Sequence, residues 1–260
     1  MARAQRPRGG VAPHVPRGVP FTISTGSAEL RDESDGTTTL WVNNVPSSPL
    51  REDPATLDFE YMRHAAAAIA AWRPPARMLA LHVGAAACAL PRHLAHVYPD
   101  SGHIAVDVDT TLPELVRTWW DLPRAPRLRI RAQDGLEALA GRTDDSLDLV
   151  VRDAFAGAWT PEHLAGDAWW SEARRTLRPR GLVVANVGAR PGSPSAASRE
   201  DVASARRAFG DVIAIAEHAV LKGRRRGNVI LVAGPVDAPS LRRYAASAPL
   251  PTGVQEDWNG

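Results

Sequence analysis

The chain has 260 residues, of which 44% are hydrophobic and 23% charged, so it can bury a sizeable core as one large domain with an appendage. Its net charge of +2 is far from a nucleic-acid-scale basic field, and we expect no nucleic acid as partner. No stretch approaches the roughly 18 apolar residues of a membrane helix, so we expect no membrane contact. Cys88 is the only cysteine, which excludes an internal disulfide and a zinc cluster and fits a reducing, cytoplasmic setting.

The N-terminal fifth of the chain divides into a tail and a strand module. Residues 1–20 contain scattered arginine, proline and glycine without the apolar segment of a signal peptide, which indicates a disordered basic tail. Within residues 21–54, two strand-like runs at 28–33 and 37–44 are separated by the turn residues 34–36. These runs predict a small antiparallel β-hairpin module.

Residues 78–109 predict a strand, a tight turn, a helix and a second strand. The first apolar run stops at Gly84, a helical pattern covers 85–98, and 104–108 supplies the second strand. A parallel unit with glycine at its first turn and a carboxylate about 20 residues later typically binds a nucleoside-bearing cofactor. Gly84 would allow the sharp turn, and Asp107 would accept hydrogen bonds from the ribose hydroxyls.

Strands and helices alternate on both sides of this unit. Helices are predicted at 55–72, 112–120, from 135 onward, at 161–178 and at 199–209, and strands at 127–131, 147–152 and 181–187. This order indicates a doubly wound, mostly parallel sheet with ligands beyond the carboxyl ends of its strands. Asp107, Asp134 and Asp153 follow strands at those ends. The runs 211–218 and 228–233, with no helix predicted between them, indicate a terminal antiparallel hairpin.

Several segments resemble the class I S-adenosylmethionine-dependent transferases and, among them, the spermidine synthase family. They are LWVNNVPSSPL, FEY, LHVGAAACALPRHL, AVDVD, QDG, DLVVRDAF and RRRGNVILVA, which together span residues 28–234. The resemblance implies a seven-stranded Rossmann-like sheet and a donor-binding transferase domain over 55–235. Residues 236–260, which are polar with proline and alanine, are predicted to be a loosely packed tail. Family members commonly dimerise through the N-terminal hairpin region, so the resemblance also suggests a homodimer.

The resemblance further implies how a donor would be held. Gly84 would begin the loop that binds decarboxylated S-adenosylmethionine or S-adenosylmethionine as co-substrate, and Asp107 would bind its ribose. Asp134 and Gly135 would meet the amino edge of the adenine. No metal is expected.

Two further residues match catalytic positions of the family. Asp153 matches the carboxylate that acts as base, and Tyr61 matches a tyrosine that faces the small-molecule amine substrate. The implied reaction is aminopropyl transfer, as in polyamine biosynthesis, for which the enzyme must deprotonate an ammonium and aim it. Asp153 could otherwise cap a helix after its strand. Phe155 and Trp159 are candidate walls of this site.

The chain departs from the family pattern in four places. Ala87 and Ala156 replace aspartates, and Ser47 and Met62 replace glutamines. Two alternatives therefore stay open. One is a methyltransferase acting on a small molecule, because an alanine at position 87 does not repel the carboxylate of the intact donor. The other is a non-catalytic paralogue that binds an adenosyl nucleoside or nothing, which the loop of Ala85, Ala86, Ala87 and Cys88 motivates.

Overall fold

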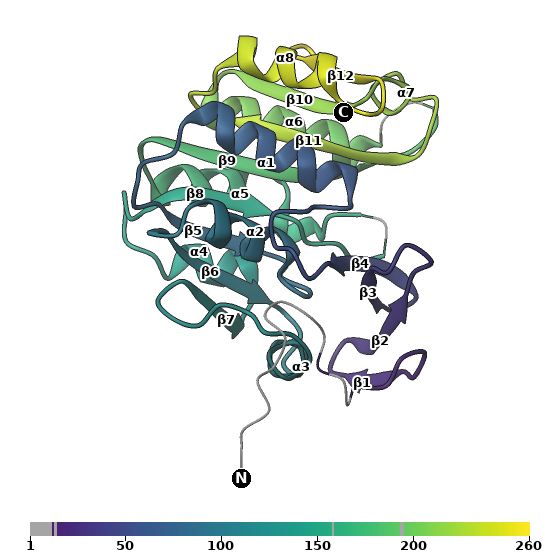
Figure 1. Ribbon diagram of the computed structural model, residues 1–260. Helices are drawn as coiled ribbons and strands as arrows, with labels where there is room; N and C mark the ends of the chain where they lie inside the picture. The colour runs from purple at the N-terminus through teal and green to yellow at the C-terminus, as the bar shows by residue number, and fades with distance from the viewer. Residues whose placement is uncertain (1–11, 13–14, 158, 193–194) are drawn as a thin grey trace.

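The computed structural model describes residues 12, 15–157, 159–192 and 195–260. The chain forms a small antiparallel sheet and a larger sheet with helices on both faces (Figure 1). The tail predicted over residues 1–20 lies largely outside the described residues. Ala12 and Val15, which are described, are buried, and the Ala12 N–H donates to the Trp119 carbonyl. None of the described helices is long and apolar enough to cross a membrane.

The N-terminal module is a four-stranded sheet rather than a single hairpin. Its strands are β1 (Phe21–Ile23), β2 (Gly26–Asp32), β3 (Thr38–Val42) and β4 (Val45–Leu50), paired antiparallel in that order. The predicted hairpin corresponds to β2 and β3. Asn43 and Asn44 have φ of 50° and 62°, which suits the tight turn between β3 and β4 because asparagine tolerates left-handed backbone.

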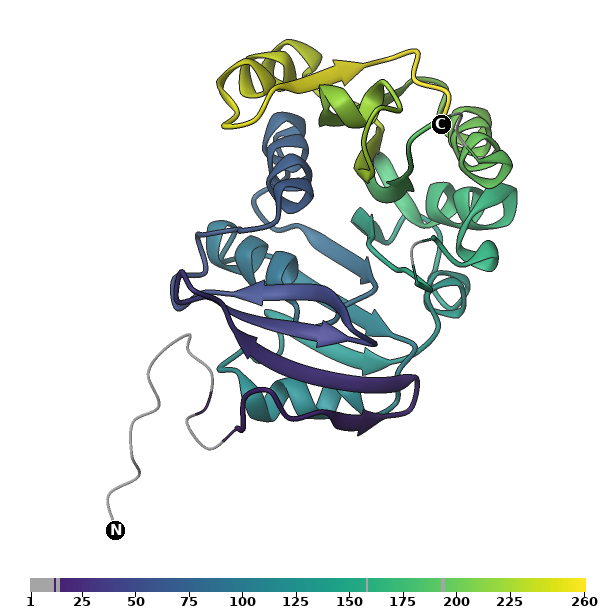
Figure 2. The same cartoon turned by 90° about the vertical axis from the view of Figure 1, so that its right-hand side faces the viewer.

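A buried aspartate attaches this module to the larger domain. The Asp109 carboxylate accepts hydrogen bonds from the backbone N–H and the hydroxyl of Thr25, at 2.7 and 2.8 Å. The same carboxylate accepts the N–H groups of Thr111 and Leu112 at the start of the next helix. This side chain thus links the small sheet, whose broad face Figure 2 shows, to the start of that helix, and the Thr110 N–H adds a bond to the Ser24 hydroxyl.

The larger sheet is doubly wound and mostly parallel, as predicted. Its strand order is β12-β10-β11-β9-β8-β5-β6-β7, with β5 to β9 parallel and β11 antiparallel to both β9 and β10. The strands are β5 (Leu79–Val83), β6 (Gly102–Asp107), β7 (Leu128–Ala132), β8 (Leu147–Arg152), β9 (Leu177–Ala189), β10 (Val212–Glu217), β11 (Gly227–Ala233) and β12 (Thr252–Gln255). The buried apolar runs of β5, β8 and β9 fit a parallel sheet covered on both faces.

The C-terminal region differs from the prediction in three ways. The sheet has eight strands rather than seven, because β12 pairs with the outer edge of β10. A short helix, α7 (His218–Leu221), lies between β10 and β11. Residues 236–260 are not loosely packed, since helix α8 (Ala238–Ser247) buries Leu241 completely and Trp258 is 9% exposed. These few buried apolar residues are widely spaced in a polar segment, so the sequence contains no periodic hydrophobic pattern that would predict a helix or strand there.

Helices cover both faces of the larger sheet. On one face lie α1 (Glu60–Trp72), α2 (Ala89–Val97), α3 (Leu112–Trp119) and α8. On the other lie α4 (Gly135–Ala140), α5 (Gly166–Thr176) and α6 (Ala196–Phe209), with the 3₁₀ turn η1 (Glu162–Leu164) before α5. Helix α1 begins at Glu60 rather than at residue 55.

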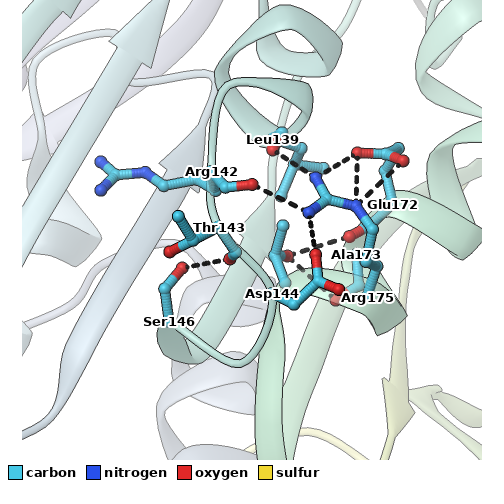
Figure 3. A network of polar contacts seen from close by, with 9 residues as sticks. Leu139, Arg142, Thr143, Asp144, Ser146, Glu172, Ala173 and Arg175 are labelled. Atoms are coloured by element: carbon cyan, nitrogen blue, oxygen red, sulfur yellow. Dashed lines mark hydrogen bonds and ion pairs between the residues drawn. The ribbon is translucent and has the colours of Figure 1, made fainter.

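A polar network ties the end of α5 to the turn that precedes β8. The Arg175 guanidinium donates to the carbonyls of Leu139 and Arg142 and to the carboxylates of Asp144 and Glu172 (Figure 3). Because Arg175 is part-buried and binds four acceptors, it orders this turn and thereby the start of β8.

The carboxyl end of β8 is held by a buried ion pair. Arg152, its last residue, is fully buried and binds both carboxylate oxygens of Asp201 on α6. The Trp170 indole N–H also donates to Asp201, at 2.7 Å. Because side chains alternate along a strand, Arg152 faces α5 and α6 while Asp153 faces the opposite side of the sheet.

We expect Asp201→Ala to lower the free energy of unfolding by about 3–5 kcal/mol, because it leaves the buried Arg152 charge without its partner. Glu200→Ala is the matched control. Glu200 pairs with Arg207 at the surface, and its loss should change stability by less than about 1 kcal/mol. Urea unfolding measures both, and equal effects of the two substitutions would contradict the assignment.

Candidate active site

A cleft of about 850 Å³ opens at the carboxyl ends of β5, β6, β8 and β9. The N-terminal sheet forms one wall, through Val42 and Asn43 and the start of β4. The cleft is lined by all six residues predicted for the site, namely Tyr61, Gly84, Asp107, Asp134, Gly135 and Asp153. Phe155 also lines it, whereas Trp159 lies outside its lining. The structure thus brings the predicted residues together, and their individual geometry indicates what each can do.

Gly84 lies where two chain segments touch. Its φ is +86°, and a Cβ at this position would lie 2.2 Å from the Asp153 carbonyl oxygen. The Gly84 N–H donates to Val106, and the Asp153 N–H donates to Val83. Only glycine satisfies both the left-handed backbone and this close approach.

Asp107 organises the loop that follows Gly84. One carboxylate oxygen accepts the N–H groups of Ala85 and Ala86, at 3.3 and 3.1 Å, and the other accepts the Asp109 N–H at 3.0 Å. Burial raises the pKa of the Asp107 carboxyl, and these N–H groups oppose that shift without cancelling it. A carboxylate offers about four acceptor sites, so hydroxyl groups in the cleft can still bind Asp107.

The loop after Gly84 keeps left-handed backbone without further glycines. Ala86 and Cys88 have φ of 42° and 61°. Ala87 is fully buried and lies outside the cleft lining, so the loop presents no side-chain charge there. Burial also raises the pKa of the Cys88 thiol to about 12, which keeps it protonated at neutral pH.

Asp134 begins helix α4. One of its oxygens accepts the N–H groups of Leu136 and Glu137, at 2.8 and 3.1 Å, and the other contacts His163 Nε2 at 2.7 Å. Burial raises the pKa of the Asp134 carboxyl, but the Glu137 N–H and the His163 ring outweigh it, so the pKa is lowered. Gly135 is required because a Cβ there would lie 2.2 Å from Val83 Cγ1.

Asp153 is part-buried and held by side chains from two other elements. Its oxygens accept the Tyr61 hydroxyl of α1 at 3.0 Å and the Asn186 side-chain N–H of β9 at 2.8 Å. Burial raises the pKa of the Asp153 carboxyl, and the two hydrogen bonds only partly oppose it. Burial and the Asp153 charge together raise the pKa of the Tyr61 hydroxyl well above its ordinary range. The carboxylate therefore binds the Tyr61 hydroxyl and the Asn186 side chain, and among the described contacts it does not cap a helix start.

Sequence reasoning missed two residues of the site. Asn186 is 3% exposed, and its Oδ1 has no hydrogen-bond partner among the described residues, so an acceptor atom remains beside Asp153. The sequence did contain a sign of this residue, because Asn186 is a lone polar residue within the apolar run of β9. His163, which contacts Asp134, had no comparable signal, because it was predicted within a helix over 161–178 and lies instead in the 3₁₀ turn η1 before α5.

The chain is similar in sequence and in fold to proteins that transfer aminopropyl groups or are described as spermidine synthases. No family model matches the chain. A polyamine aminopropyltransferase from Vibrio vulnificus is 27% identical over 131 residues, which are 50% of this chain and 43% of that protein. The chain thus covers less than half the length of this curated relative.

Solved structures match over more of the chain. A probable spermidine synthase from Corynebacterium glutamicum is 32% identical, with a TM-score of 0.86 over 94% of this chain and 92% of that one. The spermidine synthase from Thermotoga maritima is 13% identical, with a TM-score of 0.61 over 88% of this chain and 76% of that one. The second likeness is one of fold.

Gly84→Ala tests the contact between the glycine loop and Asp153. We expect it to destabilise the protein by several kcal/mol, about 1–3 from backbone strain and more from the clash, and to weaken adenosyl-nucleoside binding. Gly36→Ala is the matched control, since Gly36 has φ of +83° and open space around its Cα. Thermal unfolding of both variants separates strain from clash, and an equal loss would show that the close approach contributes nothing.

The raised pKa of Asp153 predicts a pH-dependent stability difference. Between the ordinary aspartate pKa and the raised one, the folded state binds more protons than the unfolded state, so this group destabilises the fold increasingly as pH rises. Asp153→Asn should therefore be more stable relative to the wild type at pH 7 than at pH 3. Urea unfolding at both values measures this, and a pH-independent difference would refute the raised pKa.

Proposed function

The chain belongs to the spermidine synthase family, and we propose that it transfers an aminopropyl group from decarboxylated S-adenosylmethionine to an amine. The main support is the part-buried Asp153 carboxylate, which lines the cleft and is bound by Tyr61 and Asn186. Its raised pKa makes it a stronger base than an exposed aspartate. The family relation rests on the 32% identity to the Corynebacterium glutamicum protein over nearly the whole of both chains.

The adenosyl group would bind along the ends of β5 and β6. Asp107 would accept the ribose hydroxyls beside the Gly84 loop, and the exposed side chain of Val108 would pack against the nucleoside. Asp134 and Gly135 would meet the amino edge of the adenine. To do so, the Asp134 oxygen that contacts His163 would exchange this ring for the base.

The reaction can be written with the residues at hand. An acceptor ammonium gives a proton to Asp153, and the free amine attacks the methylene carbon next to the sulfonium. The carbon–sulfur bond breaks as the new carbon–nitrogen bond forms, and its electrons stay on sulfur, which leaves as the neutral thioether of methylthioadenosine. Tyr61 keeps its proton because of its raised pKa and holds the Asp153 carboxylate in place. The step is therefore governed by positioning and proton removal.

Methyl transfer is the second candidate, and one observation favours it. Ala87 provides no charge in the loop after Gly84, so the carboxylate of intact S-adenosylmethionine would meet no repulsion there. Calorimetric titration with S-adenosylmethionine, its decarboxylated form and methylthioadenosine separates the two. Preference for the decarboxylated donor supports aminopropyl transfer, and preference for the intact donor supports methyl transfer. Binding of none would indicate a non-catalytic paralogue.

Asp153→Asn tests the base directly. We expect the turnover number to fall by at least about 100-fold, because general-base catalysis typically contributes that much, while methylthioadenosine binding stays within about twofold. Asp211→Asn is the control, with the same charge change at an exposed position before β10. Product formation by mass spectrometry and calorimetry give the two readouts. Unchanged turnover in Asp153→Asn would exclude this residue as the base.

A further inference from the structure

The acceptor end of the cleft differs in charge from the donor end. Among the described residues that line the cleft, the only carboxylates are those of Asp107, Asp134 and Asp153. Each of them already accepts hydrogen bonds from the chain itself. Beyond Asp153, where β9 and β11 form the wall, the charged lining residues are Arg190 and Arg226. A second substrate entering there meets positive charge.

The sheet register places these two arginines opposite each other. Ala189 of β9 pairs with Gly227 of β11, so Arg190 and Arg226, which are both exposed, lie across from each other one position beyond the last paired residues. Like charges directly opposite across two strands are destabilising. Neither guanidinium forms an ion pair with a carboxylate in the described part of the chain, whereas the neighbouring Arg225 pairs with Glu217. An anion between the two arginines would relieve this repulsion.

An aromatic ring holds one of these arginines. The Arg190 guanidinium carbon lies 4.5 Å from the centre of the Trp159 ring, in the segment that follows Asp153. Stacking of this kind orients a guanidinium and leaves its edge N–H groups free to donate. Arg190 is thus positioned before any ligand arrives.

The strand between the base and the arginines leaves room for a substrate. Asn186, Gly188 and Arg190 occupy alternate positions of β9 and its extension, so they lie on one face. Gly188 has no side chain, and it lines the cleft together with its cross-strand partner Asn228. Four residues of strand span about 13 Å, part of which an arginine side chain covers by reaching back. A short, flexible chain can therefore lie between Asn186 and the arginines.

We propose that the acceptor is an amine that also carries an acidic group, a carboxylate or a phosphate. This rests on the proposed function. The amine nitrogen would lie at Asp153 and the acidic group between Arg190 and Arg226, which can supply charge-assisted hydrogen bonds. A diamine would place its second ammonium against two guanidinium groups. The arginine pair lies on the opposite side of β8 from the Gly84 loop, so it serves the acceptor rather than the donor.

Matched acceptors test the proposal with the purified full chain and decarboxylated S-adenosylmethionine. The compounds 4-aminobutanoate and 1,4-diaminobutane have the same carbon chain and differ in the distal charge, and 3-aminopropyl phosphate distinguishes phosphate from carboxylate. We expect kcat/KM for one of the acidic amines to exceed that for the diamine by at least about tenfold, the factor that one good charge-assisted contact supplies. A diamine used as well or better would overturn the proposal.

Substitution of Arg190 and Arg226 tests whether these side chains bind the acidic group of the acceptor. Arg190→Gln and Arg226→Gln should each raise KM for the preferred acidic amine by about tenfold, and should lower KM for the diamine because one of the two repelling charges is gone. Arg224→Gln is the control, because it removes the same charge from an exposed position of the same turn without lining the cleft. Equal effects of Arg224→Gln and Arg226→Gln would contradict a specific contact.

Binding measurements separate failure of this proposal from failure of the proposed function. Calorimetry on the methylthioadenosine complex gives the affinities for 4-aminobutanoate, 3-aminopropyl phosphate and 1,4-diaminobutane without any reaction. If no compound is aminopropylated but an acidic amine binds more tightly and loses affinity in Arg226→Gln, aminopropyl transfer is wrong and the acceptor assignment holds. If the diamine binds more tightly, the acceptor assignment is wrong whatever the reaction.

Discussion

A part-buried carboxylate at the end of β8 is the constraint on which the rest of the site depends. Partial burial of Asp153 disfavours its charged form, so the fold holds it with donors from distant parts of the chain. Tyr61 of α1 and Asn186 of β9 supply these hydrogen bonds, while Arg152 anchors the preceding residue on the other face of the sheet. The same burial that destabilises the charged carboxylate increases its basicity.

Backbone contacts, rather than a run of glycines, shape the donor end of the cleft. Gly84 allows β5 and the end of β8 to touch, and Asp107 binds the N–H groups of the next two residues. Ala86 and Cys88 then adopt left-handed backbone, which is strained for residues with a Cβ and persists because surrounding packing and hydrogen bonds enforce it. The loop thus stays turned although no glycine follows Gly84 in it.

The two ends of the cleft carry side chains of opposite charge. Carboxylates at the ends of β6, β7 and β8 suit an adenosyl sulfonium, while the β9–β11 pair brings two arginines to the other end. The N-terminal sheet forms a wall of this cleft, and the hydrogen bonds from Thr25 to Asp109 are among the contacts that attach it.

Local patterns in the sequence were sufficient to predict the alternating strands and helices, the turn at Gly84 and the three aspartates at strand ends. Hydrophobic periodicity and turn-forming residues act over only a few neighbouring positions, so they can be recognised without the tertiary structure. The family resemblance proposed Tyr61 for the same site, and its side chain lines the cleft. The packing of α8 and β12, the hydrogen bond from Asn186 to Asp153 and the position of Arg190 across from Arg226 were decided only by the tertiary structure. Each depends on the register of strands that are far apart in the chain, and register is set by the packing of the whole sheet rather than by neighbouring residues.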